Sequence, residues 1–279
     1  MRKLAKWLGI AVGGIVTLVA LAAVTVLFLS WQRVNRVYPV ALHTVMVSNA
    51  PSAVAEGKRL AITRGCTGCH GAHLEGHVIV DEDALGTLVC PNLTQTVAQY
   101  SDAELERAIR RGVKRDGHSV GFMPSRMFYN LSDADVGAII AYLRSVPATT
   151  SRLPAMRYGP MARLGLVLGK YQLEAEVIDS TRPPVAPAEL GRYVAITSCP
   201  ECHGSDLRGD PNSGVGGAPN LVVAAGYTDS QFVRFMRTGV ALGDRQLPMM
   251  STVARERFAQ LTDREIGALL GYLKTLAQR

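Results

Sequence analysis

Several features that define common classes of protein are missing from this chain of 279 residues. We recognise no paired catalytic carboxylates, no nucleophile–base set and no phosphate-binding loop, which argues against an active site built from amino-acid side chains alone. The formal net charge is +7, but no RNA-binding or helix-turn-helix signature accompanies it. Three of the positive charges lie within residues 1–30, which contain no Asp or Glu. Nucleic acid is therefore not an expected partner.

Charge is missing altogether from residues 7–32. The apolar centre of this segment, residues 8–29, would span about 33 Å as a helix, which is enough to cross the hydrocarbon core of a bilayer. We therefore predict an N-terminal membrane anchor at 1–32. A cleaved signal peptide is the alternative, with a cleavage site at Ala20-Leu21-Ala22. Either interpretation sends the remainder of the chain out of the cytoplasm.

Cysteine is scarce, and four of the five residues lie in two pentapeptides, Cys66-Thr67-Gly68-Cys69-His70 and Cys199-Pro200-Glu201-Cys202-His203. Two cysteines three apart, followed at once by histidine, form the attachment signature of c-type haem. The thiols form thioether bonds to the haem, and the imidazole becomes an axial ligand of its iron. A zinc ribbon is the alternative, but it needs no histidine after each cysteine pair. We predict two covalently bound c-type haems, and we expect the fifth cysteine, Cys90, to be a small buried apolar residue.

The surroundings of the two pentapeptides also repeat. Gly57 to Thr63 recurs as Gly191 to Thr197, and Tyr100-Ser101-Asp102 recurs as Tyr227-Thr228-Asp229. Such an internal duplication predicts two copies of one domain. We place the boundaries as follows: anchor 1–32, stalk 33–53, first domain 54–147, proline-rich connector 148–187 and second domain 188–279.

Local signals predict several elements within these domains. Ser101-Asp102-Ala103-Glu104 is a capping box that opens a helix to about Arg111, and Ser132 opens another that runs to Pro147. The glycine-rich stretch from the first pentapeptide to Gly86 predicts a loop. Within the connector, residues 164–173 are suited to a short apolar helix.

A low-spin haem that only transfers electrons needs a second axial ligand, usually His or Met. The second repeat has no histidine except His203. Aligning Tyr100 with Tyr227 places Met123 opposite Met250, so we predict these two methionines as ligands, with Met249 as the alternative to Met250. The rival histidines in the first repeat have no counterpart in the second; they are His73, His77 and His118.

An iron-bound histidine normally donates its other ring N–H to a carbonyl or carboxylate. The sequence Pro-Asn-Leu follows each pentapeptide, starting at Pro91 and at Pro219. Because proline has no N–H, it offers only its carbonyl oxygen. We predict that these two carbonyls accept from His70 and His203, the alternative being ordinary turn prolines.

With these motifs in place, each repeat resembles a class I cytochrome c. The shared features are a glycine in the first helix, the Pro-Asn-Leu, a methionine in a late loop and a final helix that reads like Ile140-Ala141-Tyr142-Leu143. The resemblance implies an all-α fold of two tandem domains behind one transmembrane helix, with the final helix of each domain packed across the first. The whole chain is similar to membrane-anchored dihaem cytochromes of bacteria and to cytochrome subunits of periplasmic dehydrogenases.

The resemblance implies an electron carrier rather than a catalyst, held at the bacterial inner (cytoplasmic) membrane with its haem domains on the periplasmic side. Its redox partners would be a dehydrogenase or quinol-oxidising complex as donor, and an oxidase or soluble cytochrome as acceptor. A subunit permanently bound to a dehydrogenase is the alternative, and a dihaem peroxidase a more remote one. A basic cluster is either a docking face for an acidic partner or a solvated helix face; it consists of Arg107, Arg110, Arg111, Lys114 and Arg115.

Overall fold

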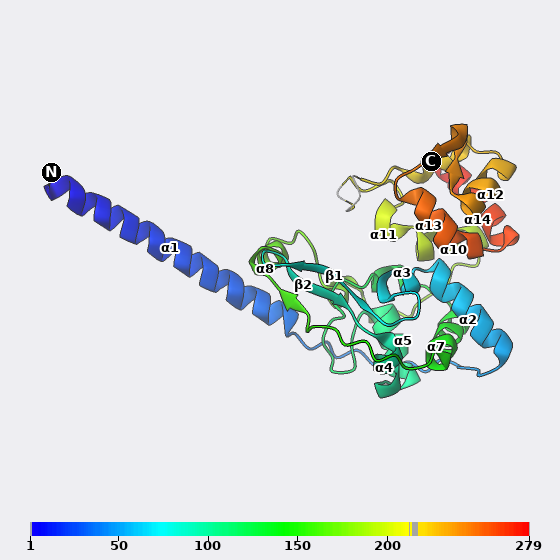
Figure 1. Cartoon of the computed structure of the whole chain (residues 1–279), viewed down its shortest axis with the longest axis horizontal. Helices are drawn as coiled ribbons and strands as arrows, with labels where there is room; N and C mark the ends of the chain where they lie inside the picture. Colours follow the sequence, from blue (N-terminus) through cyan, green and yellow to red (C-terminus); the bar gives the residue numbers. More distant parts are fainter. Residues whose placement is uncertain (1, 212, 214–216, 279) are drawn as a thin grey trace.

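The computed structural model describes residues 2–211, 213 and 217–278, and most of them are helical. A single long helix, α1 (Arg2–Val34), projects away from the rest of the chain (Figure 1). Its apolar side chains are exposed, and by length and composition it could cross a membrane. This agrees with the uncharged segment in the sequence, and both an anchor and a signal sequence fit it.

The first helical unit is built on a close crossing of two helices, α2 (Pro51–Thr63) and α7 (Asp133–Ser145). The crossing needs glycine at position 57, because a Cβ there would lie 1.8 Å from the carbonyl oxygen of Ala138. The predicted capping box is confirmed, since Ser101 and Glu104 cap each other at the start of α5. The other helices of this unit are α3 (Cys66–His70), α4 (Leu93–Thr96), η1 (Val97–Gln99), α5 (Asp102–Arg111) and α6 (Ser125–Phe128).

The second helical unit repeats this construction with α10 (Leu190–Ser198) and α14 (Asp263–Leu276). Gly191 occupies the place of Gly57, and a Cβ there would lie 2.1 Å from the carbonyl oxygen of Ala268. Its other elements are α11 (Pro200–His203), η2 (Leu221–Gly226), α12 (Asp229–Thr238), β4 (Val240–Ala241), η3 (Leu242–Asp244), β5 (Arg245–Gln246), α13 (Met250–Glu256) and η4 (Phe258–Gln260).

The expectation of a purely α-helical chain needs a correction. An antiparallel sheet of order β1-β2-β3 lies beside the first unit, formed by β1 (His77–Glu82), β2 (Gly86–Cys90) and β3 (Arg157–Tyr158). The loop predicted up to Gly86 is therefore wrong over β1. The run Val78-Ile79-Val80 suits a strand because its side chains are β-branched. Its partner β2 follows a short turn later, and the other edge of β2 pairs with β3, which comes from the connector.

The connector also holds the end of α1. It contains α8 (Pro160–Val167) and α9 (Glu174–Val177), and α8 packs against α1. Arg163 donates to the Ser30 hydroxyl at 3.1 Å, and Arg33 forms an ion pair with Glu176 at 2.5 Å. The helix predicted over 164–173 begins earlier and ends at Val167, because the chain turns at Gly169 with a φ of +67°.

Candidate haem-binding sites

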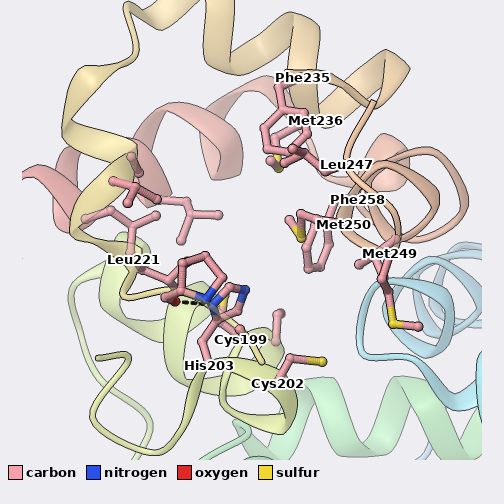
Figure 2. Close-up of a pocket in the computed structure, with 18 of the residues that line it drawn as sticks. Cys199, Cys202, His203, Leu221, Phe235, Met236, Leu247, Met249, Met250 and Phe258 are labelled. Atoms are coloured by element: carbon pink, nitrogen blue, oxygen red, sulfur yellow. Dashed lines mark hydrogen bonds between the residues drawn. The ribbon is translucent and has the colours of Figure 1, made fainter. Parts of the chain in front are cut away.

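Each helical unit contains an apolar cavity that opens to its surface. The first, of about 310 Å³, is lined by residues of the first pentapeptide together with Pro91 and Met123. The second, of about 320 Å³, is lined by residues of the second pentapeptide together with Pro219 and Met250 (Figure 2). The fold thus brings together, twice, a cysteine pair, a histidine, a proline and a methionine that are far apart in the sequence.

The two histidines are held in the same way. The Nδ1 atom of His70 lies 2.9 Å from the carbonyl oxygen of Pro91, and that of His203 lies 2.8 Å from the carbonyl oxygen of Pro219. A carbonyl can only accept, so Nδ1 carries the proton and Nε2 keeps a free lone pair for a metal. Burial lowers the pKa of both imidazoles, although the bond to the proline carbonyl acts against it. Both rings therefore favour the neutral form that binds metals.

Cys66 and Cys69 lie in the short helix α3, Cys202 lies in α11, and Cys199 is the residue directly before α11. Burial raises the pKa of the Cys66 thiol to about 11 and that of Cys199 to about 12. Cys90 is buried, as expected, and its side chain lowers the pKa of the neighbouring Cys69 thiol. No cluster of three or more His, Cys, Asp or Glu side chains that could hold a metal ion occurs in the described part of the chain, so the zinc alternative lacks a ligand set.

The methionines differ in where they point. Met249 and Met250 both line the cavity, but in Figure 2 the sulfur of Met250 faces its interior, whereas the sulfur of Met249 points away from it. Met249 is 43% exposed, and Met236 is buried in the core beside the cavity. In the first unit Met123 lines the cavity, while Met127 is a core residue. The geometry therefore favours Met123 and Met250 as sulfur ligands.

The rival candidates lie elsewhere. Neither His73, His77 nor His118 lines the first cavity. The predicted basic cluster is not one solvated face, because Arg110 is 1% exposed and donates to the carbonyl oxygen of Leu131. Only the C-terminal part of the cluster, at Lys114 and Arg115, is substantially open to solvent.

Three charged residues at the junction of the two units were not found by sequence reasoning. Glu201 stands inside the second pentapeptide but lines the first cavity, and Arg64 lines the first cavity as well. Arg257 lines the second cavity and forms an ion pair with Glu201 at 3.2 Å. No signal in the sequence indicates which faces of the two units meet.

The cavities fit a c-type haem by their chemistry. Their walls are mainly apolar, their cysteines lie one helical turn apart, and each contains a neutral histidine with a free Nε2 and a thioether from a different element. Such a ligand set is typical of covalent haem with His and Met as axial ligands.

Comparisons with known proteins agree with this chemistry. Residues 54–147 match the family model for cytochrome c. Over 292 aligned positions the chain is 25% identical to the fructose dehydrogenase cytochrome subunit of Gluconobacter japonicus, a match that covers 92% of this chain and 59% of that protein. It is 23% identical over 260 positions to the cytochrome c subunit of the quinone-dependent alcohol dehydrogenase of Gluconacetobacter polyoxogenes, covering 80% of this chain and 56% of that subunit.

A shorter match, 33% identical over 107 positions, is to a nicotinate dehydrogenase subunit of Pseudomonas putida and covers 36% of this chain and 9% of that protein. The chain thus spans little more than half the length of the dehydrogenase cytochrome subunits that it matches. Residues 54–147 are a domain of the cytochrome c family, and the chain as a whole is homologous to the cytochrome subunits of fructose and alcohol dehydrogenases.

Proposed function

We propose that this protein is a membrane-anchored cytochrome with two covalent c-type haems, which carries electrons on the periplasmic side of the bacterial inner membrane. The observation that carries this proposal is the duplication of the cavity. Each one combines a Cys-x-x-Cys-His pentapeptide, a proline carbonyl on the histidine Nδ1 and a methionine thioether. The second haem and the four axial ligands, His70, Met123, His203 and Met250, belong to this proposal.

When bound, haem supplies one-electron redox chemistry, and the protein supplies its attachment, orientation and electrostatic surroundings. The cysteines of each pair hold the cofactor covalently, and the proline carbonyl fixes the tautomer of the histidine. The thioether is a weak, neutral ligand that favours ferrous iron, which raises the reduction potential. His70 and Met123 in the first site, and His203 and Met250 in the second, would occupy both remaining ligand positions of an iron and leave none open for a substrate.

The contacts of the first helix support its proposed role as a membrane anchor. Ser30 is buried against the connector and Arg33 is paired with Glu176, so α1 enters the folded part of the chain as a fixed element. Cleavage near Ala22 would leave an exposed apolar stub from Ala23 to Leu29. A retained helix keeps these residues in lipid.

The second candidate is a cytochrome subunit that stays bound to a dehydrogenase. The relatives favour it, because they are named as subunits of fructose and alcohol dehydrogenases. Both candidates use a dehydrogenase or a quinol-oxidising complex as electron donor and an oxidase or a soluble cytochrome as acceptor. They differ only in whether the donor complex is permanent.

Optical redox titration of the detergent-solubilised protein tests the proposal. We expect two reversible one-electron steps, a low-spin spectrum in both oxidation states and no change of the reduced spectrum under carbon monoxide. A stable high-spin haem with peroxide turnover would instead support a dihaem peroxidase. Co-purification of a dehydrogenase in constant ratio would show that this protein is a permanently bound subunit of that dehydrogenase.

A further inference from the structure

The two haem-attachment segments face one another across the junction of the helical units. Glu201 belongs to the second pentapeptide and yet lines the first cavity. Arg257 lines the second cavity, but its guanidinium group packs on Gly65, the residue before Cys66. A Cβ on Gly65 would lie 2.6 Å from the Cζ atom of Arg257, so the contact depends on glycine there. The ion pair between Arg257 and Glu201, at 3.2 Å, therefore lies between the two sites.

This junction is a fixed contact. Arg59 of α2 pairs with Glu265 of α14 at 2.7 Å, and the Tyr193 hydroxyl of α10 accepts from the backbone N–H of Ser132 at 3.1 Å. Both contacts join the first unit to the second. The distance from the ion pair to each cavity is consequently set by the fold.

Two largely buried guanidinium groups lie at this place, and each of them is only partly hydrogen-bonded. The side chain of Arg257 is 15% exposed, and that of Arg64 lies beside the Tyr193 ring with 1% of the residue exposed. In both guanidinium groups, Nε and Nη2 are buried without a hydrogen-bond partner among the described residues. A buried cation is costly unless a negative charge or an acceptor lies nearby. The free-energy cost of burying such a cation falls when a nearby haem is reduced, because reduction adds a negative charge.

The charge of Arg257 acts on both attachment sites. Burial is the main influence on the thiols of Cys66 and Cys199 and raises the pKa of both, while Arg257 acts in the opposite direction at each. One guanidinium group thus lies within electrostatic range of the two positions where the haem edges would be linked.

We propose that the Arg257–Glu201 ion pair is a shared electrostatic control of the two haems. This inference rests on the dihaem function proposed above. Reduction adds one electron to an iron, which a nearby positive charge favours and a nearby negative charge opposes. Arg257 therefore raises the reduction potentials of both haems, and Glu201 lowers them. No further reactant is involved, because the pair only changes the energy of the added electron.

Redox titration of four full-length, detergent-solubilised variants tests the assignment by the sign of the shift. Arg257→Gln should move both midpoint potentials to lower values, and Glu201→Gln should move both to higher values. The double variant should return close to the wild type, because the net charge is restored. Arg257→Lys, which keeps the charge, should shift the potentials least.

Arg255→Gln is the matched control. This arginine lies two residues away, is exposed, and contacts Gln246 and Thr252 rather than either cavity. Removing its charge should leave both potentials where they are. If the role of Arg257 were only structural, both single variants would loosen the junction and shift the potentials in the same direction.

Three outcomes would overturn the inference in a protein with two haems per chain. They are shifts of equal sign in the two single variants, a shift of one haem alone, or no shift. Should Arg257→Gln fail to fold, the upward shift in Glu201→Gln still decides the question. A protein with one haem per chain would refute the proposed dihaem function instead, so the two failures are distinguishable.

Discussion

The carbonyl oxygens of Pro91 and Pro219 decide which nitrogen of each buried imidazole is free to bind a metal. Because both hydrogen bonds engage Nδ1, only Nε2 remains available. In the proposed sites, the methionine across each cavity would be the second ligand of the haem iron. Thioether ligation favours the ferrous state, so the sulfur side chains can be tested one by one.

Our first prediction concerns these sulfurs. Met123→Ala and Met250→Ala should each remove half of the near-infrared sulfur–iron band and lower one reduction potential, because each removes one thioether ligand. Neither should release haem, since the cysteine links remain. Met249→Ala is the control and should leave the band intact. If Met249→Ala removed half of the band and Met250→Ala left it intact, Met249 rather than Met250 would be the ligand.

Residue by residue, the sequence predicts most of the candidate site. The pentapeptides indicate the haem chemistry directly, and the duplication points to Met123 and Met250 because equivalent residues recur at equal spacing. Glu201, Arg64 and Arg257 could not be found this way. Their role depends on how the two units face one another, and no local pattern encodes that.

At the scale of elements, the crossing of the first and last helix in each unit depends on glycine. Gly57 and Gly191 let the backbone of α2 and α10 approach the carbonyls of α7 and α14 to a distance that no side chain permits. This contact orients the helix that leads into each pentapeptide. The glycines thus affect the cofactor site through helix packing.

The second prediction tests this crossing. Gly57→Ala should lower the free energy of unfolding by about 3 kcal/mol, because its Cβ would collide with the Ala138 backbone and the helices would have to separate. Urea unfolding of the haem-loaded protein measures the change. Gly267→Ala in α14 is the control: a Cβ there meets nothing within 4 Å, so the gain in helix propensity should stabilise by up to about 1 kcal/mol. Equal effects in both variants would contradict the account.

Helices with strong caps were predictable, and strands were not. Ser101 and Ser132 mark the starts of α5 and α7 because their hydroxyl oxygens accept from the free backbone N–H groups of Glu104 and Asp135 in the first turn. The segment at β1 is short, and its hydrogen bonds go to β2, whose other edge pairs with a strand about 70 residues further on. The glycines around it suggested a loop, although pairing with β2 makes it a strand.

At the scale of the whole molecule, ion pairs hold the two units and the first helix together. Arg59 binds both Glu56 of its own helix and Glu265 of α14. Burial of the Glu265 carboxyl would raise its pKa, but the hydrogen bond and charge of Arg59, together with the hydrogen bonds from Thr262, outweigh this and hold the pKa below its usual range. The pair therefore makes the contact between the units sensitive to acid.

The third prediction is a pH dependence with a defined sign. A carboxyl with a depressed pKa in the folded state contributes stability above its unfolded pKa, and loses it as the pH falls through the folded value. Glu265→Gln should therefore lower the free energy of unfolding by about 2 kcal/mol at neutral pH, and the difference from the wild type should shrink below about pH 4. Unfolding curves from pH 3 to 7 measure it. If the difference in unfolding free energy between the wild type and Glu265→Gln grew as the pH fell, the predicted direction of the pH dependence would be wrong.

The fourth prediction concerns the anchor. High-salt and carbonate washing should leave the protein in the membrane pellet, because the exposed apolar surface of α1 stays in lipid. Deletion of residues 2–29 should release it. This deletion ends before Ser30, so that the contact of Ser30 with the connector is kept. Release of a natural shortened chain that begins near Ala23 would instead identify a signal peptide.

The number of haems per chain tests the central claim most directly. Intact mass and haem staining of the denatured protein should show two covalent haems in the wild type. Replacing Cys66 and Cys69, or Cys199 and Cys202, by alanine should leave one haem in each variant, because the two cavities are separate and equivalent. One haem in the wild-type chain, lost completely when a single cysteine pair is removed, would contradict the account.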